Sequence, residues 1–179
     1  METIRSKGFT LLELMITLFI VSILFAAAIP SFKDMSTRNR LVTYTNDFIA
    51  TINLARSEAV RRGSPVSICS SADGKACGGG WSDGWVTFAD PDSDGVIADA
   101  DTDIIRVHEG LASRYSLGAD ADLATHVTYG ADGSANTGGA FAVCHDGKLK
   151  GSRAVVLTRL RPRVGTDTNN NGIPNVKTD

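Results

Sequence analysis

Three arginines alternate near the end of the chain in a pattern that favours phosphate binding. In the stretch TRLRPRVG, Arg159, Arg161 and Arg163 occupy every second position. In an extended segment such residues point the same way, about 6–7 Å apart. A guanidinium group binds a phosphate through a planar, bidentate fork. The spacing therefore favours contact with successive phosphates of a nucleic-acid strand, and Pro162, which lacks a backbone donor, favours an edge or loop position.

More basic residues precede these arginines: Lys148, Lys150 and Arg153 are close in sequence and could widen the basic patch. The whole chain has a formal net charge of −2, which argues against a broadly basic nucleic-acid-binding protein. Any anion-binding site must therefore be local. The alternative is that the arginines form a solvated face or pair with acidic neighbours such as Asp167.

Aspartates in two stretches are spaced as in calcium-binding loops. Asp90, Asp92 and Asp94 begin the pattern D-x-D-x-D-G, and Asp101 stands where an EF-hand loop usually ends in Glu. A looser version spans 167–171. Such strings are also common in turns between strands, because Asp and Asn bond to their own backbone. We favour the turn interpretation and expect no metal or other cofactor.

The remaining reactive side chains do not indicate an enzyme. His108, His126 and His145 lie in separate strand-like runs without the spacing of metal ligands. The sequence has no P-loop motif. Cys144 precedes His145, but neighbours in sequence are not thereby a nucleophile and its base. We therefore expect a protein without catalytic residues.

The first structural element that the sequence predicts is an apolar run near the N-terminus. From Phe9 to Ile29 the chain is apolar apart from small hydroxyl residues and Glu13, which is about the length needed to span a bilayer as a helix. The leader METIRSKG carries Arg5 and Lys7, which favour a cytoplasmic N-terminus. An A-x-A-like cleavage site does not follow the run. A carboxylate in a membrane span is costly, so Glu13 is a functional candidate.

The cysteines suggest one disulfide bond and one thiol. Three cysteines in a chain exported across a membrane permit one such bond. Cys69 and Cys77 enclose a short polar loop with an Asp-Gly turn, and they are the favoured pair. Spacing does not exclude a bond from Cys144 to either of them.

After Pro30 the pattern becomes amphipathic and predicts a helix lying on a core. This helix should continue the membrane helix with a bend at Pro30 and stop at Gly63. The core-facing positions recur at steps of three and four residues: Leu41, Thr45, Phe48, Ile52, Ala55 and Ala59.

From Pro65 onward the sequence predicts short strands separated by Asp-Gly, Gly-Gly and Asn-rich turns. The expected strands are VSIC, GWVTFAD, DIIRVHE, HVTYG, AFAVCHD and RAVVLTRL. No second helix of any length is predicted. The fold class is α+β, with an antiparallel β domain packed on the C-terminal half of one long helix. The expected parts are a leader at 1–8, a transmembrane helix at 9–29, its amphipathic continuation at 30–63 and a β domain at 64–179.

The string K-G-F-T-L-L-E-L, with its basic leader and apolar continuation, resembles the type III signal of type IV prepilins and type II secretion pseudopilins. The resemblance implies cleavage after Gly8 by prepilin peptidase and N-methylation of Phe9. It also implies a role for Glu13 in subunit assembly, in which the Phe9 amine of a neighbouring subunit neutralises the carboxylate. Many pilins also carry a helix-kinking proline where Pro30 stands.

Two further stretches, LARSEAVRRGSPVSIC and WSDGWVTFADPDSDG, are similar to the core of GspH/FimT-type minor pilins and pseudopilins, and so imply a type IV pilin-like fold. The matching positions are Arg56, Ser57, Glu58, Ala59, Trp81, Gly84, Trp85 and Phe88. Trp85 and Phe88 are expected in the core, as large aromatic residues in a strand usually are.

In the FimT branch of this family a Gly-Arg-x-Arg motif is implicated in DNA uptake. Arg161 and Arg163 match its arginines, whereas Leu160 stands in place of its glycine. Leucine resists backbone conformations that glycine allows, so the resemblance is incomplete at this point.

The resemblance thus implies a FimT- or FimU-like minor pilin of a type IV pilus, made as a single-pass inner-membrane precursor. The β domain would face the periplasm or the exterior. The implied partners are major and minor pilins, prepilin peptidase, the inner-membrane assembly platform and, through the arginines, double-stranded DNA. The alternative is a GspH-like pseudopilin of a type II secretion system.

Overall fold

A computed structural model of the chain describes residues 8–159 and 162–165, with the backbone alone at 27, 30, 149 and 150. The chain divides into two compact units, Met1–Asn39 and Arg40–Asp179. One α-helix, α1 (Leu11–Arg62), contributes residues to both units.

In the first unit, α1 begins after a threonine cap. Thr10 Oγ1 accepts a hydrogen bond from the Glu13 N–H at 3.2 Å, as an N-cap hydroxyl does. The backbone is helical through Pro30, so the predicted bend does not interrupt the helix there. Large apolar side chains along this part of α1 are exposed, and the helix is long and apolar enough to cross a membrane.

In the second unit, α1 lies on a core as its periodicity predicts. All six predicted core-facing residues are at most 4% exposed. The helix ends at Arg62, and Gly63 follows with φ of 65°, a left-handed conformation that glycine adopts without strain at a helix end. Both the core face and the end of the helix therefore match the sequence-based prediction.

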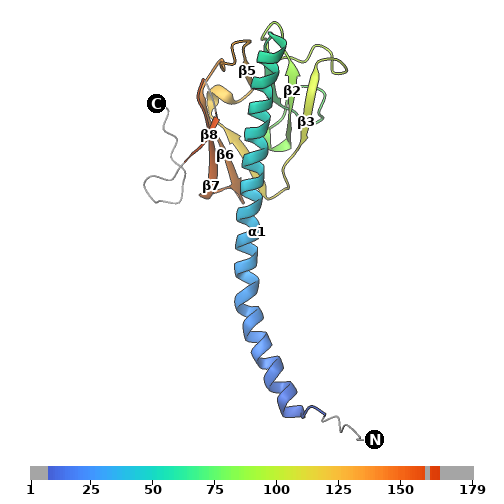
Figure 1. Ribbon diagram of the computed structural model, residues 1–179, viewed down its shortest axis with the longest axis vertical. Helices are drawn as coiled ribbons and strands as arrows, with labels where there is room; N and C mark the ends of the chain where they lie inside the picture. Colours follow the sequence, from blue (N-terminus) through green and yellow to red (C-terminus); the bar gives the residue numbers. More distant parts are fainter. Residues whose placement is uncertain (1–7, 160–161, 166–179) are drawn as a thin grey trace, which may run out of the picture. The chain divides into compact units, whose positions relative to one another are not determined.

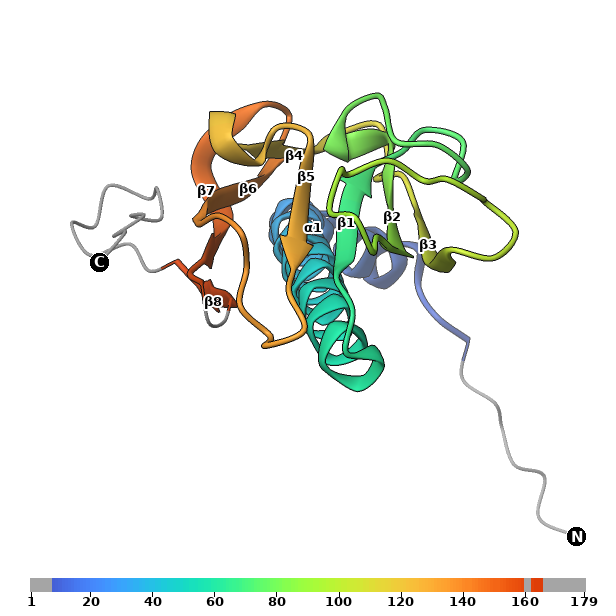
Figure 2. The ribbon, with the colours of Figure 1, turned by 90° about the horizontal axis from the view of Figure 1, so that it is seen from above.

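The described part of the second unit contains two four-stranded antiparallel sheets. The first sheet has the order β3-β2-β1-β5 and the second β4-β6-β7-β8. In Figures 1 and 2, β2 and β3 lie on one side of α1 and β6, β7 and β8 on the other. The strand bounds are β1 Val66–Ser70, β2 Gly84–Ala89, β3 Ile104–Glu109, β4 Tyr115–Ala119, β5 His126–Tyr129, β6 Gly139–His145, β7 Lys148–Leu157 and β8 Pro162–Val164.

Two of these strands were not predicted. β4 has the sequence YSLGA, which is weak in β-branched residues, and it forms by pairing along β6. β8 is only three residues long and pairs with β7. The other six strands match the predicted runs, and the described residues contain two short 3₁₀ turns, Trp81–Asp83 and Ala121–Leu123, but no second α-helix.

An aromatic cluster joins the helix to both sheets. The Phe48 ring of α1 lies 5.2 Å from the Trp85 ring of β2 and 4.5 Å from the Phe141 ring of β6, measured between centroids. Trp85 Nε1 also donates a hydrogen bond to Thr51 Oγ1 at 3.0 Å. Trp85 and Phe88 are almost fully buried, as predicted for core residues.

Candidate functional site

The residues of the predicted processing and assembly site lie at the start of α1. Gly8 and Phe9 precede the helix in an irregular segment, and the Phe9 side chain is 78% exposed. Glu13 lies in the first helical turn and is also exposed. The peptide bond after Gly8 is thus outside regular structure, and the Glu13 carboxylate can be approached from outside the chain.

The basic segment is a hairpin, which corrects the prediction of one extended strand. β7 ends at Leu157, which pairs with Pro162 of β8, so the chain reverses between them. Arg159 lies in this reversal, and Arg163 lies on β8 opposite Val156. Leu160 and Arg161 lie outside the described residues. Arg159 and Arg163 are both exposed, but they do not lie on one strand.

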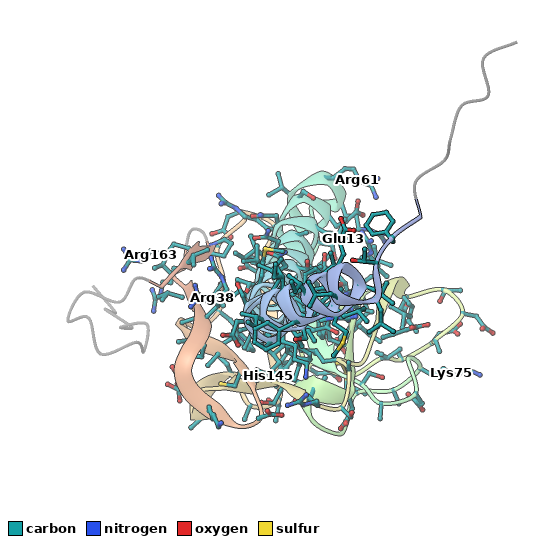
Figure 3. All side chains as sticks on the ribbon, turned by 90° about the horizontal axis from the view of Figure 1, so that it is seen from below. Glu13, Arg38, Arg61, Lys75, His145 and Arg163 are labelled. Atoms are coloured by element: carbon teal, nitrogen blue, oxygen red, sulfur yellow. A yellow bond between two sulfur atoms is a disulfide. The ribbon has the colours of Figure 1, made fainter. Side chains whose placement is uncertain are left out.

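Pro162 starts β8, the edge strand of the second sheet, in agreement with the edge position predicted for it. Proline is tolerated there because an edge strand leaves one side of its backbone unpaired. Figure 3 shows the Arg163 side chain at the periphery of the second unit, on the opposite side from Lys75.

Lys148 and Arg153 do not extend this patch as expected. Lys148 begins β7 and Leu157 ends it, so Lys148 lies up to about 30 Å along the strand from the chain reversal. Arg153 is half-buried, and its buried Nε atom lacks a hydrogen-bond partner among the described residues. The side chain of Lys150 lies outside the described part of the chain.

The fold instead brings a residue of α1 to the hairpin. A Cβ atom on Gly133 would lie 3.2 Å from Arg56 Nε. In the same turn, the Ala135 N–H donates to the Arg159 carbonyl at 2.8 Å. No local pattern in the sequence connects Arg56 with the C-terminal arginines, because their proximity depends on the β5–β6 turn packing against both α1 and the hairpin.

The first acidic stretch forms a tight turn. Carboxylate oxygens of Asp90, Asp92 and Asp94 come within 4.8 Å of one another. Asp90 is 1% exposed and accepts hydrogen bonds from the Asp94 and Gly95 N–H groups and from Ser67 Oγ. The two bonds from backbone N–H groups are the turn chemistry favoured by the sequence. The second stretch, 167–171, lies outside the described residues.

The cysteines are arranged as the sequence favoured. Cys69 and Cys77 form a disulfide bond, and Cys144 is a buried free thiol. Burial raises the pKa of the Cys144 thiol, because a thiolate is poorly solvated in an apolar interior. A raised pKa disfavours the nucleophilic form.

The three histidines lie in different surroundings. His108 stacks on Trp85 with a centroid distance of 3.9 Å, and His145 lies 4.9 Å from Tyr115. The His126 ring is close to the backbone of Gly95. These contacts fit packing roles on separate elements.

Comparisons with known proteins define the class. Residues 4–29 match the family model described as the prokaryotic N-terminal methylation motif. The structure is similar to the type IV minor pilin FimU of Pseudomonas aeruginosa PAO1 in two crystal forms. In space group P21 the identity is 26%, the match covers 73% of this chain and 91% of that chain, and the TM-score is 0.57. In space group P65 the identity is 25%, the match covers 73% of this chain and 90% of that chain, and the TM-score is 0.51. The fold is that of a type IV pilin.

Residues 44–160, more than half of the chain, match the model of the type II transport protein GspH. The chain therefore belongs to the GspH family of minor pilins and pseudopilins, whose members are structural subunits and not enzymes. A comparison with curated proteins gave no match. The methylation motif and the apolar N-terminal helix fit a membrane-anchored precursor that is incorporated into a pilus.

Proposed function

We propose that this chain is a minor pilin that is cleaved after Gly8 and helps to initiate or cap a type IV pilus. The observation that carries the proposal is the likeness to FimU over 91% of that chain, together with the methylation motif at 4–29. In this mechanism the apolar part of α1 leaves the inner membrane at the assembly platform and packs among the helices of major and minor pilins.

Glu13 acts in this assembly as the partner of a methylated Phe9 amine on a neighbouring subunit. Its exposure in the first turn of α1 supports the role. Two charges taken together into an apolar helix bundle must be paired, because an unpaired buried charge costs several kcal/mol.

The test compares Glu13→Gln with Asp34→Asn, which removes a carboxylate from the same helix outside the apolar run. Both variants should be cleaved by prepilin peptidase, and mass spectrometry should find methylated Phe9 at each N-terminus. Glu13→Gln should lower incorporation into sheared filaments by about tenfold or more, whereas Asp34→Asn should not. A mature N-terminus other than Phe9 would overturn the proposal.

The β7–β8 hairpin gives the filament a second role, which is capture of double-stranded DNA for uptake. The exposed side chains of Arg159 and Arg163 support this role, and Arg161 stands between them in the sequence. Arginine contacts to phosphate give binding that weakens steeply with salt and has little sequence preference.

This role is tested by salt titration of duplex binding with the full chain in non-ionic detergent. The double variant Arg161→Gln, Arg163→Gln should lower the slope of log affinity against log salt by about 2. The matched control Lys75→Gln, Arg106→Gln makes the same change in net charge in the part of the chain that forms the first sheet. Equal binding by the two double variants would count against the hairpin as the DNA contact.

A GspH-like pseudopilin is the second candidate function, favoured by the description of the matching family as a type II transport protein. Deletion of the gene separates the two functions. Loss of exported enzymes with intact pili supports secretion, whereas loss of pili with normal secretion supports the pilus.

A further inference from the structure

The turn at 130–135 between β5 and β6 is closed by its own backbone. The Gly130 N–H donates to the Ser134 carbonyl at 2.9 Å, and the Gly133 N–H donates to the Gly130 carbonyl at 2.8 Å. Figure 2 shows this connection between the C-terminal end of α1 and the β7–β8 hairpin.

On one side of the turn lies Arg56. Its Nε and Cγ atoms are 3.2 and 3.7 Å from the position that a Cβ on Gly133 would occupy. The side chain of Arg56 therefore crosses the turn at Gly133, where the missing side chain leaves room for it. Arg56 as a whole is half-buried.

On the other side lies the hairpin. The Ala135 N–H donates to the Arg159 carbonyl at 2.8 Å. Gly133 and Ala135 are two residues apart, so their Cα atoms are separated by at most ~7 Å. Cationic residues of α1 and of the hairpin thus border one short turn. A duplex carries one negative charge per ~1.7 Å of its axis, so a single DNA segment lying across the turn presents phosphates to both.

We propose that Arg56 is a phosphate contact for double-stranded DNA, so that the DNA-binding surface runs from the β7–β8 hairpin across the 130–135 turn onto α1. This inference rests on the DNA capture proposed above. Arg56 adds a contact from an element that is rigid and distant in sequence from the hairpin.

One acidic residue lies within this surface. The Asp132 carboxylate accepts hydrogen bonds from the N–H and Oγ of Ser134, and the bond from the backbone N–H lowers the pKa of Asp132. Asp132 therefore stays negative at neutral pH and opposes phosphate binding. Its removal should strengthen binding if DNA lies across the turn.

The test measures duplex binding by the full chain in non-ionic detergent at several salt concentrations. Arg56→Gln should weaken binding about three- to tenfold and lower the salt slope by about 0.9, and Arg56→Lys should keep the slope. Arg106→Gln on β3 is the matched control and should leave both values unchanged. Asp132→Asn should bind more tightly than Asp122→Asn, which removes an exposed carboxylate from another turn.

The outcomes separate this inference from the function on which it rests. Loss of binding in the Arg161→Gln, Arg163→Gln variant, with Arg56→Gln behaving as Arg106→Gln, would overturn the role of Arg56 and keep the hairpin. Absence of binding by the unmodified chain would overturn both. If thermal unfolding shows that Arg56→Gln does not fold, the comparison of Asp132→Asn with Asp122→Asn tests the inference instead. Equal DNA binding by these two variants would overturn it.

Discussion

Phe48 of α1 contacts aromatic residues from several elements of the second unit. Its ring meets Trp81, Trp85 and Phe141 at centroid distances of 5.8, 5.2 and 4.5 Å, and it is 1% exposed. Aromatic pairs in such tilted or edge-on arrangements add to the free energy of burial. A single side chain thus couples α1 to both sheets.

Phe48→Ala should lower the free energy of unfolding by about 3–5 kcal/mol, because it removes these contacts and leaves a cavity. Val60→Ala is the control on the same helix. Val60 is 55% exposed, so its truncation should change the free energy by less than about 0.5 kcal/mol. Chemical denaturation measures both, and equal effects would contradict the central position of Phe48.

At the scale of elements, the C-terminal end of α1 carries a network of oppositely charged side chains. Glu58 accepts hydrogen bonds from Arg61 and Arg62 of the last turn, and these bonds lower its pKa to about 2 from the ordinary 4.5. The folded state therefore holds the Glu58 carboxylate in its charged form more strongly than the unfolded chain does.

Because the pKa of Glu58 is lowered on folding, its contribution to stability is complete above about pH 4.5 and is lost as the pH falls toward about 2. Glu58→Gln should accordingly melt at a lower temperature than the unmodified chain at pH 7. The difference should shrink as the pH falls through about 2 and vanish below it. Thermal unfolding followed by circular dichroism gives both values, and a difference that persists at low pH would exclude this network as its cause.

At the scale of the whole molecule, the two units differ in what they bury. The buried apolar residues extend from Leu41 to Leu157, all within the unit Arg40–Asp179. The described part of the first unit is a helix with exposed apolar side chains. Such a surface needs lipid or other helices around it, which is what a pilin helix finds first in the membrane and then in the filament.

A chain that begins at Arg40 should therefore fold on its own. We expect one cooperative unfolding transition in the absence of detergent, with a midpoint within about 2 °C of that of the second unit in the full chain, since the core loses no buried apolar residue. Differential scanning calorimetry makes the comparison. A broad or missing transition would mean that residues 1–39 contribute to the core of the second unit.

The sequence by itself determined the features that repeat locally. The apolar run with Glu13 predicted the exposed helix, and the steps from Leu41 to Ala59 predicted the buried face of α1. Gly63 marked the helix end, and alternating β-branched residues marked six strands. These signals are readable because helix and strand periods and glycine's backbone freedom act over a few neighbouring residues.

Only the tertiary structure decided how the basic residues are grouped. β4 and β8 exist because they pair with β6 and β7, and the pairing of β8 turns the arginine segment into a hairpin. The 130–135 turn then brings Arg56 beside that hairpin, while Lys148 lies at the far end of β7. Residues that strand pairing and turn packing bring together are far apart in the sequence and follow no helix or strand period. Composition and spacing therefore could not predict their proximity.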